Sequence, residues 1–383
     1  MIVPLLILGL LSATPEGAPP STAAAAFAAG EFPRAAEAYA AELTANPADF
    51  DALVRLAALR LYSEDLDGAQ AFLERAAALQ PDSPRLSGLR ATLLGRRDVR
   101  GSLANATLAG AEARVPFVAA EPLPLVTVSV NGHDALFVVD TGAPDIVLDP
   151  AFAQELGIAT TAAGTGTFAG GKTGTVQHAV VDRFAAGVAT VRAMPATVSP
   201  TRMVPFFPGR RVDGILGTGF FMRFTSTIDY PHAQLVFRPR GAQASPPSAI
   251  VVPFWLVGDH FLFARGRVND APEALMLIDT GLAGGGLAPT KATIDAAHIA
   301  LDTQHADTGI GGGGNVAIVP FTAARVQLGA AVVHDVPGLY TPEGTPFAIF
   351  PFTTGGAVSH DFLKHFTLTF DFVRMHLVLT PAS

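Results

Sequence analysis

Two Asp-Thr-Gly tripeptides, Asp140-Thr141-Gly142 and Asp279-Thr280-Gly281, constrain this chain more than any other feature of its sequence. Each follows a run of four apolar residues typical of a buried strand, 136–139 and 275–278. A carboxylate at the end of a buried strand is costly unless a partner compensates it. We therefore expect the two to meet and share one proton, because like charges a few Å apart cannot both ionise easily. Such a pair suits hydrolysis of an amide by an activated water.

The sequence around the first tripeptide is repeated around the second. A proline follows each aspartate by ten residues, and an apolar-Asp-aromatic segment recurs near the end of each copy. The matched segments are Val115-Pro116-Phe117 with Val252-Pro253-Phe254, Pro150 with Pro289, and Ile228-Asp229-Tyr230 with Phe370-Asp371-Phe372. This pattern indicates a duplicated unit of about 130 residues, which is an ordinary domain size.

Short apolar runs between Gly, Pro, Asn and Asp turns predict that both copies are mainly β. Leu125–Val130 alternates with period two and ends at Asn131-Gly132, a hairpin signal. One short helix is expected after each tripeptide, the first of them capped by Asp149 and ended by Gly157. The predicted fold is therefore mainly β, with two homologous β lobes, a cleft between them and an α-helical N-terminal region. Asp229 and Asp371 are expected to be structural turn residues.

With these motifs in place, residues 115–381 resemble the retropepsin-like aspartyl proteases, in a form with two lobes on one chain. The resemblance implies an aspartic endopeptidase in which Asp140 and Asp279 activate a water against a peptide bond. It implies no metal and no cofactor. The residues expected to support the loops are Thr141, Gly142, Ala143, Ile215, Leu216, Gly217, Thr280 and Gly281. The residues expected in substrate-covering flaps are Gly166, Phe168, Gly170, Gly311 and Gly312.

The second copy departs from the family pattern. Leu282 stands where the family has a small residue, and Gly284-Gly285-Gly286 aligns with 145–147 of the first copy. Ala357-Val358-Ser359 replaces Ile-Leu-Gly, so the supporting glycine is lost. We expect a looser second lobe. Two alternatives to the peptidase stay open: an inactive module that binds peptides, and a lobe that pairs with its copy in a homodimer.

Residues 166–173 spell the Gly-x-x-x-x-Gly-Lys-Thr pattern of a phosphate-binding loop. Such a loop needs a buried strand before it and a helix after it. Residues 159–163 predict no strand, and 174–180 predict a strand rather than a helix. The match is therefore interpreted as a coincidence within the first flap.

The N-terminal region differs in composition and is rich in Ala, Leu, Glu and Arg. Pro47 and Pro81 lie 34 residues apart, the tetratricopeptide period. The segment resembles two such repeats and a capping helix over Pro84–Leu94, and it either binds a protein partner or only packs on the β region. The expected domains are 1–20 (signal peptide or disordered), 21–98 (helical), 99–114 (linker), 115–240 (first lobe), 241–249 (linker) and 250–383 (second lobe).

Composition narrows the classes of partner. The net charge of −8 and the lack of a basic stripe argue against nucleic acid, and no other segment is long enough to span a membrane. The apolar segment Met1–Leu11, with Ala13 as a cleavage point, predicts a signal peptide and export to the periplasm or medium. The alternative is a cytoplasmic protein with a mis-assigned start. A peptide or protein substrate is the expected ligand.

Overall fold

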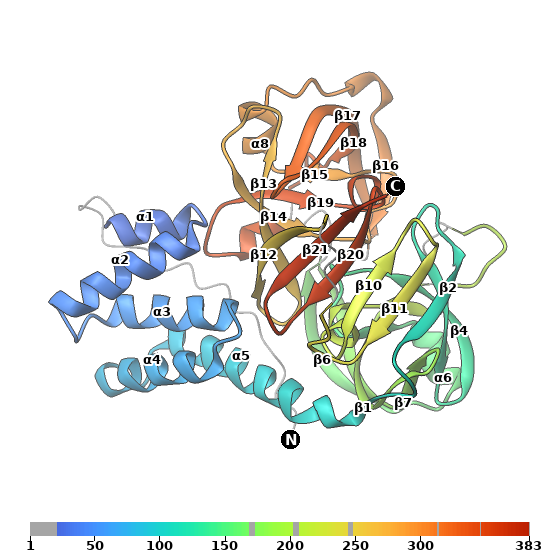
Figure 1. Cartoon of the computed structure of the whole chain (residues 1–383), viewed down its shortest axis with the longest axis horizontal. Coiled ribbons are helices and arrows are strands. Elements are labelled where there is room, and N and C mark those ends of the chain that lie inside the picture. The colour runs from blue at the N-terminus through green and yellow to red at the C-terminus, as the bar shows by residue number, and fades with distance from the viewer. Residues whose placement is uncertain are drawn as a thin grey trace. The chain divides into compact units, whose positions relative to one another are not determined.

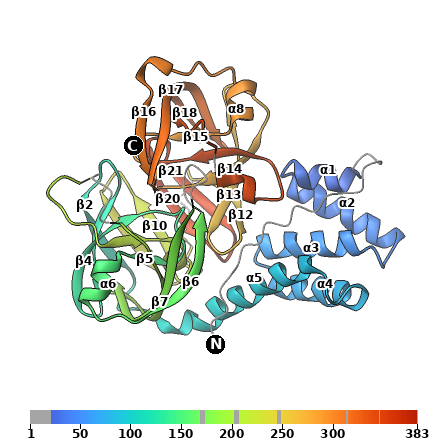
Figure 2. The same ribbon diagram turned by 180° about the vertical axis from the view of Figure 1, so that it is seen from behind.

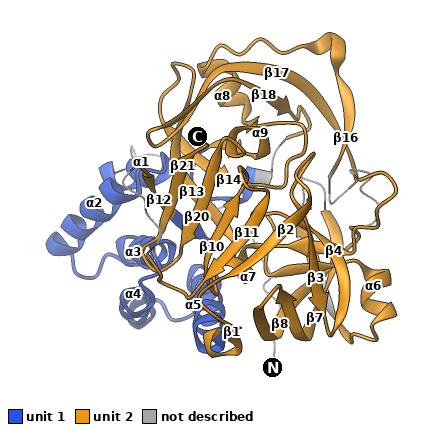
Figure 3. Cartoon of the chain, turned by 45° about the vertical axis from the view of Figure 1, so that its right-hand side comes forward, with its two compact units in different colours: residues 1–102, 255–259, 347–354 blue, residues 103–254, 260–346, 355–383 orange. Residues whose placement is uncertain are grey.

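The computed structural model describes residues 21–167, 173–201, 207–243, 248–311, 314–344 and 346–382. It divides into two compact units, coloured in Figure 3. The first, here the helical unit, comprises residues 1–102, 255–259 and 347–354. The second, the β unit, comprises residues 103–254, 260–346 and 355–383. The expected signal peptide lies outside the described residues. No helix in the described part is long and apolar enough to cross a membrane.

The helical unit begins with five α-helices. They are α1 (Thr22–Ala28), α2 (Phe32–Ala45), α3 (Phe50–Tyr62), α4 (Leu66–Leu79) and α5 (Pro84–Gly101). The carboxylates of Asp49 and Asp65 cap α3 and α4 by accepting backbone N–H bonds. Helix α5 continues well beyond the predicted end at Leu94, and it takes in the start of the expected linker 99–114.

An aromatic cluster holds the helical unit together. The Phe32 ring packs against Tyr62 at 5.3 Å, against Trp255 at 5.4 Å and against Phe352 at 5.0 Å between ring centroids. The backbone N–H of Thr353 also donates to the Ala28 carbonyl at 2.7 Å. The segments 255–259 and 347–354 therefore belong to the core of this unit, although they are far from the helices in sequence.

A buried ion pair adds to this core. The Arg96 guanidinium, only 3% exposed, bonds the Glu64 carboxylate and donates to the carbonyl oxygens of Leu256 at 3.1 Å and Gly258 at 2.6 Å. Burial lowers the pKa of Arg96, and the Glu64 charge opposes that shift. The arginine thus ties α5 to the 255–259 segment through two carbonyl groups and to Glu64 through its carboxylate.

The first lobe of the β unit is built from strands, as the sequence predicts. Its strands are β1 (Ala106–Leu108), β2 (Ala113–Ala119), β3 (Leu125–Val130), β4 (His133–Val139), β5 (Ile146–Leu148), β6 (Thr160–Thr167), β7 (Thr173–Ala186), β8 (Ala189–Val198), β9 (Gly214–Leu216), β10 (Thr225–Asp229) and β11 (Gln234–Arg238). Its short helices are α6 (Pro150–Glu155) and α7 (Thr218–Phe221). Asp149 caps α6 and Gly157 follows it with φ +63°, both as expected.

The second lobe repeats this order. Its strands are β12 (Ile250–Val257), β13 (Phe261–Val268), β14 (Ala274–Ile278), β15 (Leu287–Pro289), β16 (Asp307–Gly311), β17 (Gly314–Leu328), β18 (Ala331–Tyr340), β19 (Thr354–Val358), β20 (Phe366–Asp371) and β21 (His376–Pro381). Its helices are α8 (Lys291–Ala296) and α9 (His360–Leu363). The prediction of a duplicated, mainly β unit is confirmed.

One antiparallel sheet joins the lobes, a feature that the sequence did not reveal. Its order is β2, β11, β10, β20, β21 and β12, so each lobe contributes three strands. At its centre β10 lies beside β20, as Figure 1 shows. Thr227 pairs there with Thr369, and their buried hydroxyls are 2.8 Å apart. This shared sheet fixes how the two lobes face each other.

Two sequence expectations need correction. Residues 160–167 form strand β6, although 159–163 predicted no strand, because pairing with β7 provides the hydrogen bonds that local sequence does not signal. The segment after the Gly-Lys-Thr match is strand β7, as expected, so it lacks the helix that a phosphate loop requires. The linker expectation is the second that needs correction. The expected linker 99–114 contains the 3-10 helix η1 (Ser102–Asn105), strand β1 and the start of β2.

The buried ion pair gives a stability prediction. Glu64→Ala leaves the Arg96 charge buried without its carboxylate, and we expect the unfolding free energy to fall by about 3–5 kcal/mol. The matched control is Asp67→Ala, which removes the solvent-exposed pair between Asp67 on α4 and Arg97, the neighbour of Arg96 on α5. It should cost less than about 1 kcal/mol. Denaturant unfolding followed by circular dichroism checks both, and equal losses would contradict the assignment.

Candidate active site

The two lobes place their Asp-Thr-Gly loops by the same backbone contacts. In the first lobe, β4 runs parallel to β9, and the Asp140 N–H donates to the Leu216 carbonyl at 3.1 Å. In the second lobe, the Asp279 N–H donates to the Val358 carbonyl of β19 at 3.0 Å. Each aspartate thus leaves the end of a buried strand at a fixed point, and Leu216 has the supporting position predicted for it.

The threonines bind the two loops to each other. The Thr280 hydroxyl accepts the Thr141 N–H at 3.0 Å and donates to the Val139 carbonyl at 3.2 Å. The Thr141 hydroxyl accepts the Thr280 N–H at 3.1 Å and donates to the Ile278 carbonyl at 2.9 Å. Both threonines are at most 1% exposed. These four reciprocal bonds bring the loops of one chain together.

Each glycine makes room for the aspartate of the other lobe. A Cβ on Gly142 would lie 2.8 Å from the Asp279 carboxyl carbon, and one on Gly281 would lie 2.3 Å from that of Asp140. The amide of Gly142 donates to its own Asp140 carboxylate at 2.7 Å, and that of Gly281 to Asp279 at 2.8 Å. Glycine is required here because the facing carboxylate occupies the space of a side chain.

The two carboxyl groups have altered pKa values. Burial raises the pKa of Asp140 well above its usual range, and the negative charge of Asp279 raises it further. Burial also raises the pKa of Asp279, while bonds from the Gly281 N–H and the Asp140 carboxyl oppose that rise. The arrangement therefore favours a single proton shared by the two carboxyl groups.

The first lobe supports its loop with the predicted segment and with one further residue. Gly217 donates to the Asp145 carbonyl at 3.1 Å, and a Cβ there would lie 1.7 Å from the Pro144 carbonyl oxygen. Ile215 pairs with both β4 and β5, and Ala143 accepts the Thr218 N–H at 3.1 Å. The Thr218 hydroxyl, which sequence reasoning missed, donates to the Thr141 carbonyl at 2.8 Å.

The second lobe uses a serine where the first has Gly217. The Ser359 hydroxyl donates to the Asp279 carbonyl and accepts the Leu282 N–H at 3.1 Å. Its backbone N–H donates to the Gly286 carbonyl at 2.9 Å. In place of the lost glycine, the serine side chain therefore bonds the loop directly. The position of Ser359, which matches that of Gly217 in the first lobe, was the sequence signal that could have revealed this role.

The alignment of the glycines Gly284 to Gly286 also needs correction. Strand pairing matches Leu287 with Ile146, since these residues oppose Val358 and Leu216 respectively. The second loop is therefore two residues longer than the first. A Cβ on Gly286 would lie 2.5 Å from the Phe362 amide nitrogen. The glycines accordingly form a longer loop packed under α9, rather than a weakened strand.

Both predicted flaps have the expected hairpin form. Strands β6 and β7 pair antiparallel and lie side by side in Figure 2, with Gly166 opposite Gly174. Strands β16 and β17 pair likewise, with Gly311 opposite Gly314. Phe168, Gly170 and Gly312, which the sequence also predicted to cover the substrate, lie outside the described residues.

The remaining acidic candidates are occupied elsewhere. Asp229 accepts bonds from His232, Gln234 and Thr367, and these bonds together lower its pKa although burial opposes them. Asp371 binds the backbone N–H groups of the turn that follows it. Both match the predicted turn role. Asp145 lies 3.7 Å from the buried Arg223 guanidinium, so it is paired rather than freely solvated.

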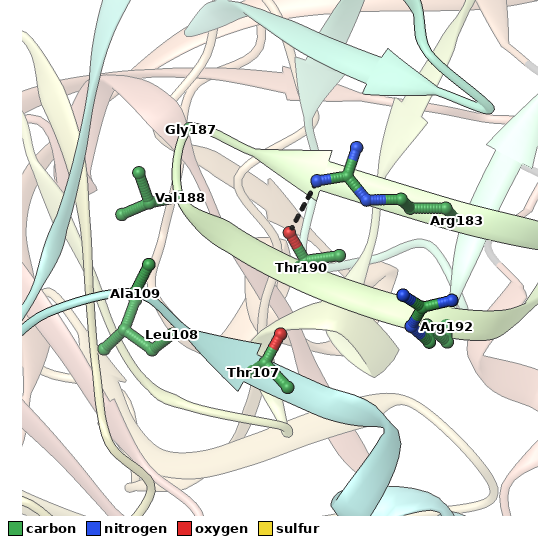
Figure 4. Close-up of a pocket in the computed structure, with 8 residues that line it drawn as sticks. All are labelled: Thr107, Leu108, Ala109, Arg183, Gly187, Val188, Thr190 and Arg192. Carbon is green, nitrogen blue, oxygen red and sulfur yellow. Dashed lines mark hydrogen bonds between the residues drawn. The ribbon is translucent and has the colours of Figure 1, made fainter.

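A separate surface cavity of about 420 Å³ lies beside β1 and the β7–β8 hairpin. Figure 4 shows Arg183 and Arg192 at one side of it, with Arg183 donating to the Thr190 hydroxyl at 3.4 Å. None of its lining residues belongs to the two Asp-Thr-Gly loops.

The threonine bonds can be tested by substitution. Thr141→Val leaves the buried Thr280 N–H and Ile278 carbonyl without partners, and we expect a loss of at least about 2 kcal/mol in unfolding free energy. Thr141→Ser keeps the hydroxyl and should retain most of the stability. Chemical denaturation measures both variants. A serine variant as unstable as the valine variant would show that the hydroxyl is not what matters.

The raised pKa of Asp140 also predicts how stability depends on pH. A pKa above the unfolded value of about 3.9 means that the folded state binds more protons. The contribution of this group is therefore complete at low pH and is lost as pH rises through its folded pKa. Asp140→Asn cannot ionise, so its stability relative to the wild type should increase with pH. Thermal unfolding from pH 3 to pH 8 measures this, and a constant difference would contradict it.

Comparisons with known proteins agree with this architecture. The aspartyl protease family model matches residues 126–220 and 264–351, one copy in each lobe. A tetratricopeptide repeat model matches residues 26–93. No curated protein matches. The solved structures that match include a retropepsin-like aspartic protease from Rickettsia conorii, with 19% identity over 35% of this chain and 93% of that one. Its TM-score of 0.25 is too low to support a shared overall arrangement.

The family matches fall on the parts of the chain that the structure distinguishes. Each aspartyl protease match contains one Asp-Thr-Gly loop, and the tetratricopeptide match spans α2 to α4 entirely. Each of the two lobes of this chain therefore matches the aspartyl protease family, and a segment that matches the tetratricopeptide repeat precedes them.

Proposed function

We propose that this protein is an aspartic endopeptidase whose catalytic pair is Asp140 and Asp279. The observation that carries the proposal is the reciprocal packing of the two loops within one chain. Each aspartate lies against the glycine of the other lobe, and the threonines hold both loops. Family membership supports a peptidase in general terms.

Because the pair shares one proton, the two aspartates can divide the work of acid and base, and we assign the acid to Asp140 and the base to Asp279. Asp279, as the carboxylate, takes a proton from a water, and the resulting hydroxide attacks the peptide carbonyl carbon. Asp140 gives its proton to the carbonyl oxygen, which forms a neutral tetrahedral intermediate. The proton held by Asp279 then passes to the amide nitrogen, and the C–N bond breaks. Asp140 recovers a proton from the intermediate hydroxyl as the new carboxyl group forms.

The same chemistry predicts a bell-shaped dependence on pH. Activity needs one proton on the pair, so it should fall as pH drops and Asp279 is protonated. It should fall again as pH rises through the elevated pKa of Asp140 and the shared proton is lost.

Peptide cleavage tests the proposal. We expect the wild-type protein to cleave extended peptides from a mixed library, and Asp140→Asn and Asp279→Asn each to lower kcat/KM by at least about 10²–10⁴-fold. Asp134→Asn is the matched control, since Asp134 lies on β4 with an exposed side chain. Equal cleavage by the wild type and Asp140→Asn would exclude the mechanism.

A binding module remains the competing proposal, and the same reagents separate the two. A module that only captures peptides would bind library members without producing new termini at any pH. A homodimeric enzyme would lose activity on dilution, whereas a pair of loops completed within one chain should not. The tetratricopeptide region is also proposed to contact a protein, because such repeats commonly do so.

A further inference from the structure

The residue that follows Ser359 makes a contact that the matching residue of the first lobe does not. Thr218 stays within its own lobe and bonds the Thr141 carbonyl. His360 instead reaches the other lobe, where its Nε2 lies 3.1 Å from a carboxylate oxygen of Glu121. Glu121 precedes β3, in the connection from β2. The duplicated loops therefore have unequal supports, and only one of the two spans the lobes.

The imidazole of His360 is tightly held. It is 1% exposed and packs against the Tyr230 ring, which follows β10, with 5.5 Å between centroids. Its Nδ1 has no hydrogen-bond partner among the described residues. Burial lowers the pKa of His360, and the charge of Glu121 opposes that shift. A neutral ring with its proton on Nε2, donated to Glu121, satisfies this geometry.

Lys364 completes the cluster. Its ammonium group donates to Glu121 at 3.1 Å and also bonds Asp361 on α9. Glu121, His360 and Asp361 bring one nitrogen and two oxygens within 4.8 Å of one another, a spacing that would also suit a cation. Because Lys364 already contacts both carboxylates, the positive charge of the cluster comes from the chain itself.

We propose that Glu121, His360 and Lys364 form an interlobe latch, and that His360 is a positioning residue for the Asp279 loop. The covalent path is short: His360 adjoins Ser359, and the Ser359 hydroxyl donates to the Asp279 carbonyl and accepts the Leu282 N–H. An anchor on the first lobe thus fixes the helix start that holds the catalytic loop of the second. The inference rests on the proposed peptidase function for its kinetic consequence only.

The latch acts through position rather than through stability. Glu121 is 62% exposed, so its ion pair with Lys364 adds little to the free energy of unfolding. Misplacement of a reacting group by about 1 Å, however, can lower a rate by about 10²-fold. No described hydrogen bond joins His360 to the aspartate carboxylates, so His360 acts on the reaction only through the position of the Asp279 loop. Its loss should therefore lower kcat and leave KM unchanged.

Three variants test the latch. His360→Phe fills the space without a donor, Glu121→Ala removes the acceptor from an exposed site, and His360→Gln restores a donor near Nε2. We expect the first two to lower kcat by about 10- to 100-fold with KM unchanged, and to speed hydrogen exchange of the Leu282 amide. The glutamine variant should recover both properties. His365→Phe, at an exposed position just beyond α9, is the matched control.

The outcomes separate the latch from the peptidase proposal. Unchanged kcat and unchanged amide exchange in His360→Phe and Glu121→Ala would overturn the latch. So would a His360→Gln variant as impaired as His360→Phe, because the donor would then be irrelevant. If the wild type cleaves no peptide at any pH, the proposed function fails, and exchange at Leu282 alone decides whether the latch holds the loop.

Discussion

The reciprocal bonding of Thr141 and Thr280 is the interaction on which the site depends. Each hydroxyl accepts an N–H from the facing loop and donates to a strand-end carbonyl across the lobe boundary. Both groups are buried, so losing either would leave polar backbone atoms without partners in a region that water does not reach. This requirement, together with the sheet shared by β10 and β20, keeps two half-buried carboxyl groups close, and their proximity disfavours ionisation of both at once.

The duplicated lobes show how one loop geometry is supported by two different sets of contacts. In the first lobe, Gly217 lets the chain pass close to Pro144, and Thr218 bonds the loop. In the second, Ser359 bonds the loop itself, which frees the next position, His360, to reach across to Glu121. The longer glycine loop beneath α9 follows from the same change, because the start of that helix packs against Gly286.

The helical unit is held by a different principle. Its aromatic cluster takes in Trp255 and Phe352, and Arg96 bonds carbonyl groups of the 255–259 segment. Residues distant in sequence thus fill the interior that a short array of helices cannot fill alone. The face of the helices that contacts these rings is therefore occupied by the chain's own residues.

Local signals predict the duplication, the β class, the helical repeats and the two Asp-Thr-Gly loops, because strand periodicity, proline spacing and short motifs can be seen within a short stretch of chain. Local motifs also predict Asp149 as a helix cap, and Asp229 and Asp371 as turn residues. The roles of Ser359, His360 and Glu121, the register of the glycine loop and the strand at 160–167 become visible only in the tertiary structure. These features depend on residues far apart along the chain, and a hydrogen bond between the lobes produces no periodic pattern in the sequence of either lobe.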